Sequence, residues 1–162
     1  MERIEQALRT ALAGRRAVVM GVGQALRGDD GFGPAAAGLL AGRSAAPVID
    51  AGGAPENFTG AVRRHRPELL LVLDAADFGG APGELRLLGP GELAGGGPST
   101  HAGSLRTLFD YLRAECGAEA LVLAAQAGRL EFGAEMSPAV AASARRAAEL
   151  VIAALGAGPA GA

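Results

Sequence analysis

The chain has 162 residues, a length typical of one domain, and a formal net charge of −2. Hydrophobic residues make up 49% and charged residues 20%, which predicts a packed core rather than a disordered chain. The charge excludes a basic footprint for nucleic acid, and no apolar run approaches the ~20 residues of a membrane span. The single cysteine, Cys116, excludes an internal disulfide and favours a reducing, cytoplasmic compartment.

The N-terminal part alternates helical and strand-like segments. Ile4, Leu8 and Leu12 recur every four residues and predict a helix. Residues 17–22 form a short apolar run that predicts the first strand. A helix is expected after it, with Pro34 in its first turn.

The middle of the chain contains two more predicted strands. Residues 47–50 predict a short strand, and residues 56–66 predict a helix. That helix must end before Pro67, because the residue that precedes a proline avoids the helical region. Residues 69–73 are a continuous apolar run ending in Asp74, a pattern typical of a central parallel strand buried on both faces.

The second half of the chain continues this alternation. Residues 84–88 predict an edge strand, and the Gly- and Pro-rich residues 89–99 predict a loop. Apolar residues at helical spacing predict an amphipathic helix over 103–116, and residues 121–125 predict another buried strand.

Ser137 and Pro138 predict the start of a last helix, with a capping hydroxyl and a proline at the first helical position. Residues 156–162 are small and are expected to form a flexible tail. Short strands that alternate with helices predict one α/β domain over residues 1–162, a sandwich around a mostly parallel sheet.

Three polar features lie at predicted strand ends, where open α/β sheets bind their ligands. Asp29 and Asp30 follow the first strand, Asp74 ends the strand over 69–73, and His101 precedes a helix. Right-handed crossovers bring such strand ends to one edge of the sheet. Two carboxylates and an imidazole suit a divalent transition metal, and three protein ligands leave a position open for water or substrate.

Each of these residues has a structural alternative. Asp29 or Asp30 is equally well placed to cap the following helix, and Asp74 to accept hydrogen bonds from the next turn. His101 has the alternative of an ordinary hydrogen-bonded histidine. His65 stands among three arginines and is expected to be a surface residue.

A second functional class rests on glycines. Gly21 and Gly23 after a strand, with Asp50 at the end of the next strand, resemble a dinucleotide-binding fingerprint. The next glycine, Gly28, comes five residues after Gly23 instead of three. The two carboxylates that follow it would repel a pyrophosphate, so the signs of the charges favour a cation.

An ordered set of motifs runs through about residues 17–155. Its members are Gly21-Val22-Gly23, Gly28–Pro34, Asp50–Asn57, Leu73–Gly79, Pro82-Gly83-Glu84, Ser99-Thr100-His101, Phe132-Gly133 and Met136-Ser137-Pro138. This set is similar to that of the hydrogenase maturation endopeptidases, and Asp50–Asn57 looks most like the branch that processes hydrogenase 3.

The resemblance implies a five-stranded, three-layer α/β sandwich and an endopeptidase activity. The family removes the C-terminal extension from the precursor of the nickel–iron hydrogenase large subunit after nickel insertion. The family's metal-contacting and catalytic residues fall on Asp30, Asp74 and His101. The metal is expected to be nickel supplied by the substrate. Metal-assisted hydrolysis is expected, and the family's carboxylates also permit an aspartic-type classification.

By family position, Asp50, Gly52 and Gly53 are expected to bind substrate by shaping its cleft, and structural support is the equal alternative for Asp50. The helix within residues 1–14 is additional to the family pattern. Two alternative functions stay open: a Rossmann-like nucleotide- or cofactor-binding module, and a catalytically silent chaperone for hydrogenase assembly.

Overall fold

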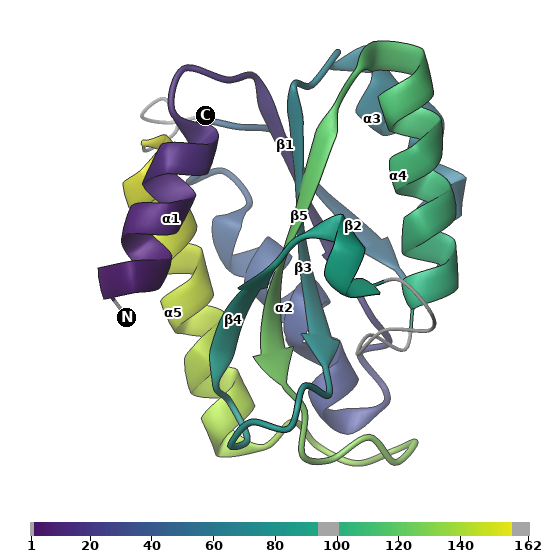
Figure 1. Cartoon of the computed structure of the whole chain (residues 1–162). Coiled ribbons are helices and arrows are strands. Elements are labelled where there is room, and N and C mark those ends of the chain that lie inside the picture. Colours follow the sequence, from purple (N-terminus) through teal and green to yellow (C-terminus); the bar gives the residue numbers. More distant parts are fainter. Residues whose placement is uncertain (1, 94–100, 157–162) are drawn as a thin grey trace.

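The computed structural model describes residues 2–93 and 101–156, and their helices and strands form three layers (Figure 1). The strands are β1 (Ala17–Val22), β2 (Val48–Gly52), β3 (Leu69–Ala76), β4 (Leu85–Leu88) and β5 (Glu119–Gln126). The α-helices are α1 (Glu2–Leu12), α2 (Phe32–Leu40), α3 (Thr59–Arg64), α4 (Ala102–Cys116) and α5 (Pro138–Leu155). Short 3-10 turns span Gly28–Gly31, Pro55–Phe58 and Pro90–Leu93.

The described strands form one sheet in the order β2-β1-β3-β5-β4. The pairs β1–β2, β1–β3 and β3–β5 are parallel, whereas β4 pairs with β5 in the antiparallel sense. β4 is the edge strand that its alternating pattern predicted. The predicted α/β sandwich around a five-stranded, mostly parallel sheet is therefore confirmed.

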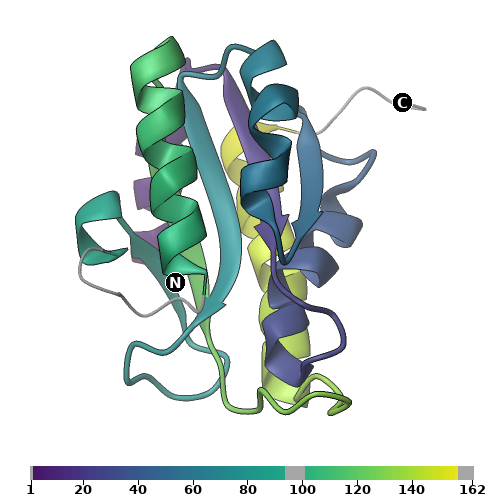
Figure 2. The ribbon, with the colours of Figure 1, turned by 90° about the vertical axis from the view of Figure 1, so that its right-hand side faces the viewer.

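Helices cover both faces of this sheet (Figure 2). α1, α2 and α5 pack on one face, where Leu8, Phe32 and Val151 belong to one hydrophobic cluster. α3 and α4 pack on the other face, where Val62 and Leu108 belong to a second cluster. Successive β3 side chains enter alternate clusters, so all eight residues of this strand are buried.

Two predicted boundaries are wrong for physical reasons. A 3-10 turn over Pro55–Phe58 replaces the start of the helix predicted over 56–66, and α3 has only six residues. Arg66, which precedes Pro67, has φ 46° and lies outside the right-handed helical region. β3 continues past Leu73 to Ala76. Its end is set by backbone pairing with β5, which extends to Ala76, and not by the first polar residue of the segment.

The predicted N-terminal helix is present as α1, which contacts α5. Most of the predicted loop over 89–99 and nearly all of the predicted flexible tail over 156–162 lie outside the described residues. None of the described helices is both long and apolar enough to cross a membrane.

Candidate metal centre

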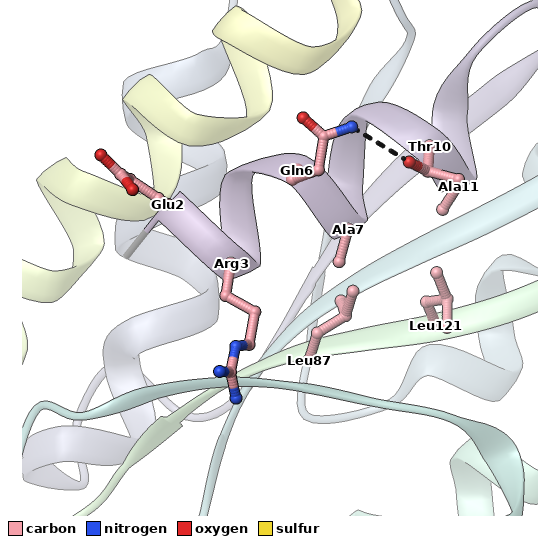
Figure 3. A pocket seen from close by; sticks show the side chains of 8 residues that line it. All are labelled: Glu2, Arg3, Gln6, Ala7, Thr10, Ala11, Leu87 and Leu121. Carbon is pink, nitrogen blue, oxygen red and sulfur yellow. Dashed lines mark hydrogen bonds between the residues drawn. The ribbon is translucent and has the colours of Figure 1, made fainter.

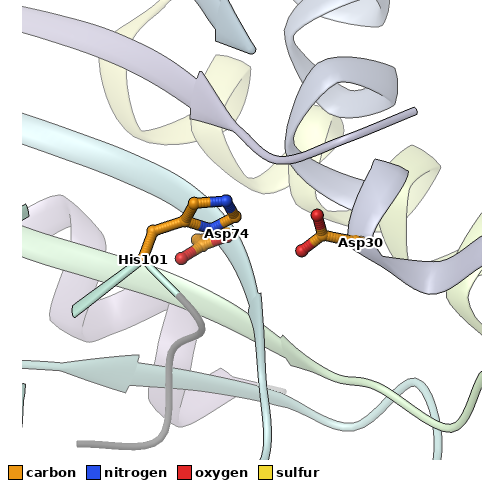
Figure 4. Close-up of side chains that lie close together, drawn as sticks. All are labelled: Asp30, Asp74 and His101. Carbon is orange, nitrogen blue, oxygen red and sulfur yellow. Dashed lines mark ion pairs between the residues drawn. The ribbon is translucent and has the colours of Figure 1, made fainter. Parts of the chain in front are cut away.

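Asp30, Asp74 and His101 come together at one end of the sheet (Figure 4). Each offers one ligand atom, and these atoms all lie within 4.8 Å of one another. Both carboxylates are buried, with Asp74 0% and Asp30 3% exposed, and His101 is half-buried. Because two buried carboxylates at this separation repel each other, a cation between them would offset that repulsion. The donor set therefore fits a divalent transition metal.

The sheet topology explains why residues so far apart in sequence meet. The chain leaves β1 toward β2 and leaves β3 toward β4, which lies beyond β5, so neighbouring strands β1 and β3 send their connections in opposite directions. Ligands of open α/β sheets bind at such a switch point. Asp30 follows β1, and Asp74 lies near the carboxyl end of β3. Asp74 points to the same face of the sheet as Val72, because side chains two residues apart in a strand share a face. α4 covers that face, and His101 is the residue before α4.

Glycines and one backbone amide fix the position of Asp30. Its Oδ2 accepts a hydrogen bond of 2.7 Å from the backbone N–H of Gln24. Gly23 has φ +145°, and a Cβ there would collide with the backbone carbonyl oxygen of Asp30. A Cβ on Gly21 would collide with the backbone of Gly33 in α2. The glycines that resembled a dinucleotide fingerprint thus permit close packing around the acidic turn.

Asp29 holds a second loop against this turn. Its Oδ1 accepts hydrogen bonds from the backbone N–H and the hydroxyl of Ser137, at 2.7 and 2.8 Å. Its Oδ2 accepts from the backbone N–H groups of Gly128 and Arg129, at 2.8 and 2.9 Å. Burial raises the pKa of Asp29, but these four hydrogen bonds outweigh burial and leave the pKa below its usual value.

These bonds correct two predictions. The cap of α2 is Gly31, and no side chain caps it, so neither Asp29 nor Asp30 is the helix cap that was the alternative. Ser137 precedes α5 as predicted, but its hydroxyl does not cap that helix. The hydroxyl donates to Asp29 instead, because an ionised acceptor makes the stronger hydrogen bond.

His101 is coupled to both carboxylates. Its Nδ1 lies 3.5 Å from Oδ1 of Asp74. The hydrogen bond to Asp74 raises the pKa of His101 above its usual value, and the charges of Asp74 and Asp30 add to this effect. Burial and the charge of Arg27 lower the pKa by less. A proton on His101 therefore competes with a metal ion for this cluster.

The residues predicted to shape a substrate cleft lie beside the same loop. Asp50 is exposed, and its Oδ1 accepts from the backbone N–H of Gly52 at 3.1 Å. The carbonyl of Gly52 accepts from Gly23 N–H at 2.8 Å. A Cβ on Gly53 would meet the side chain of Gln24 at 2.6 Å. The turn after β2 thus adjoins the loop that leads to Asp30.

Sequence reasoning missed Gln126, which organises the turn after β3. Its Oε1 accepts from the backbone N–H groups of Phe78 and Gly80, and its Nε2 donates to Asp77. Gln126 is a buried polar residue at the end of β5. The same signal, a polar residue closing an apolar strand, had singled out Asp74.

Other candidate features lie apart from the cluster. A hollow of about 740 Å³ lies between α1 and the strands β4 and β5, where Leu87 and Leu121 face the helix (Figure 3). It includes no member of the metal-ligating set. His65 is exposed, as expected. Cys116 ends α4, at the opposite end from His101, so it contributes no nucleophile to the cluster.

Comparison with known proteins relates the chain to one family. The model of the HycI hydrogenase maturation protease family matches residues 39–154. The hydrogenase 3 maturation protease of Escherichia coli K12 is 42% identical over 107 residues, which are 62% of this chain. The chain spans 66% of the length of that relative.

Solved structures show the same fold. A NiFe hydrogenase maturation protease HycI from Thermococcus kodakarensis is 31% identical, with a TM-score of 0.83, and the match covers 92% of this chain and 98% of that one. The solution structure of an endopeptidase HycI from Escherichia coli is 32% identical, with a TM-score of 0.73. That match covers 82% of this chain and 86% of the other.

Proposed function

The chain belongs to the hydrogenase maturation protease family, and from that premise we propose that it is an endopeptidase for the precursor of a nickel–iron hydrogenase large subunit. It removes the C-terminal extension after nickel has been inserted. The observation that carries the proposal is the meeting of Asp30, Asp74 and His101 with ligand atoms within 4.8 Å of one another. The proposal includes a cytoplasmic location, expected from the single cysteine.

In this proposal the nickel belongs to the substrate. Asp30 and Asp74 supply negative charge toward the metal in a buried setting, where charge–charge attraction is stronger than in water. His101 supplies an imidazole, a donor that suits nickel. A metal held there polarises the scissile carbonyl or activates a water molecule for attack. A precursor without nickel lacks the ion that these three side chains contact and is not cut.

The Gly52-Gly53 turn and Asp50 are proposed to line the path of the precursor. The turn touches Gln24, whose backbone amide holds Asp30, so a peptide lying on the turn leads directly to the cluster. The hydrogen bond from Gly52 N–H to Asp50 also supports the structural alternative for this side chain. The two roles make different predictions for the Asp50→Asn variant.

The test is incubation of the purified chain with nickel-loaded and nickel-free large-subunit precursor, followed by intact mass measurement. We expect the loaded precursor alone to lose the mass of its C-terminal segment. Equal cleavage of both forms would refute the role of nickel, and no cleavage of either would refute the proposed function. Calorimetric titration with a dinucleotide at millimolar concentration tests the nucleotide-binding alternative, for which no binding is expected.

A further inference from the structure

Two large apolar side chains are exposed on loops at the carboxyl end of the sheet, the end that carries the metal cluster. Among the described residues, the large hydrophobic side chains that are strongly exposed are Leu26 (64%), Phe132 (78%) and, at a lower level, Leu39 (37%). Leu26 lies in the loop between β1 and the acidic turn, and Phe132 lies in the loop between β5 and α5. Single exposed apolar residues are common, but large apolar side chains that are grouped on a surface favour contact with a partner.

A backbone hydrogen bond joins these two loops into one surface. The N–H of Gly133 donates to the carbonyl of Leu26 at 2.7 Å, directly beside Phe132. The N–H of Gly28 donates to the carbonyl of Ala134 at 3.1 Å, and Asp29 binds the same loop through its carboxylate. The Leu26–Phe132 pair therefore stands on a rigid support, which lowers the entropy cost of binding a partner.

The same support leads into the cluster. Leu26 is four positions before Asp30, and the charge of Arg27 acts on the imidazole of His101. On its other side the Leu26 loop contacts the turn at Gly52. A polypeptide whose scissile bond reaches the cluster must cross the surrounding loops, and Leu26 and Phe132 lie on two of these loops.

The charges around the pair indicate what kind of segment it accepts. Arg27 and Arg129 are exposed on these loops, and so are Glu131 and Glu135. Equal numbers of opposite charges give no net attraction for an acidic or a basic peptide. Apolar contact must then supply the affinity, as it does at the centre of protein interfaces.

We propose that Leu26 and Phe132 form a docking surface for an apolar segment of the polypeptide substrate next to its scissile bond. The inference rests on the proposed function and adds a recognition element outside the metal cluster. The pair acts in binding and takes no part in the chemical step, so it governs KM for the precursor and not kcat.

The test compares Leu26→Ser, Phe132→Ser and the double variant with wild type in cleavage of nickel-loaded precursor. We expect KM to rise about tenfold for Phe132→Ser and further for the double variant, with kcat within about twofold of wild type. Leu39→Ser, on α2 and away from both loops, is the matched control and should leave KM unchanged. Phe132→Tyr should retain most of the affinity, because the ring remains. A wild-type KM in the double variant, or a fall in kcat alone, would overturn the proposal.

A binding measurement separates this inference from the proposed function. Surface plasmon resonance with immobilised precursor reports docking without requiring cleavage. Wild type that binds but does not cut, together with weaker binding by the double variant, would refute the proposed function and keep the docking surface. Equal binding by wild type and the double variant, or no binding by wild type, would overturn the docking surface. Sedimentation of both proteins gives a further check. A wild type that is a dimer and a double variant that is a monomer would also overturn the docking surface, since the pair would then serve self-association.

Discussion

The Nδ1 atom of His101 lies 3.5 Å from Oδ1 of Asp74, which joins the residue before α4 to the central strand β3. The carboxylate of Asp74 is fully buried, whereas the imidazole is half-buried. This contact places an imidazole at the mouth of an acidic site formed by Asp74 and Asp30.

Substitution in the cluster should abolish cleavage without unfolding the protein. We expect Asp30→Asn, Asp74→Asn and His101→Ala each to lower kcat/KM for nickel-loaded precursor by at least about 100-fold, because each removes a contact to the metal. Asp110→Asn on α4 and His65→Ala are matched controls, since both residues are exposed. Circular dichroism checks the fold, and wild-type rates in all three cluster variants would refute the assignment.

Metal binding should depend on pH through His101. Its pKa is raised, chiefly by the hydrogen bond to Asp74, so the imidazole keeps its proton to a higher pH than a free histidine. A metal ion must displace that proton. Affinity for Ni²⁺ alone should therefore fall about tenfold for each pH unit below this pKa and level off above it.

Isothermal titration of the chain with NiCl₂ at several pH values measures this dependence. The His101→Ala variant should bind more weakly and lose the dependence near neutral pH. An affinity of the wild type that is constant from acid to neutral pH would contradict the role of the imidazole as a ligand.

Loss of the Asp29 carboxylate should destabilise the fold. Asp29→Ala leaves the N–H groups of Gly128, Arg129 and Ser137 without their acceptor, which should cost about 3 kcal/mol of unfolding free energy. The pKa of Asp29 is lowered in the folded state, so its contribution is present above the unfolded pKa of about 3.9 and is lost as the pH falls through the folded value.

Urea unfolding at neutral pH and at about pH 3 measures both effects. The difference in stability between wild type and Asp29→Ala should be large at neutral pH and smaller in acid. Asp110→Asn serves as the control for loss of an exposed carboxylate. A stability difference that does not change with pH would show that the charge of Asp29 is not what the four donors require.

Asp50→Asn separates substrate binding from structural support. The amide retains an oxygen that accepts from Gly52 N–H, so the turn should persist. If Asp50 contacts the precursor through its charge, KM should rise about five- to tenfold while the melting temperature stays within about 1 °C, because the residue is exposed. An unchanged KM in Asp50→Asn, together with a lower melting temperature in Asp50→Ala, which lacks the acceptor oxygen, would assign Asp50 to structural support.

Much of this protein follows from the sequence alone. The apolar run from Leu69 predicted a strand buried on both faces, and the spacing of Leu105, Leu108 and Leu112 predicted an amphipathic helix, because burial imposes periods that are visible in the chain. Strand-end positions in the sequence also indicated Asp29 or Asp30, Asp74 and His101 as candidate ligands, and the family resemblance selected Asp30.

Only the tertiary structure decided how the polar groups are used. Ser137 had the pattern of a helix cap, and Asp29 had the same local signal as Asp30. The fold brings Ser137 to Asp29, about a hundred positions apart in the chain, and aims Asp30 at the cluster instead. Such choices depend on contacts between distant segments, which local pattern does not encode. The end of β3 beyond Asp74 was likewise set by its partner β5 and not by its own residues.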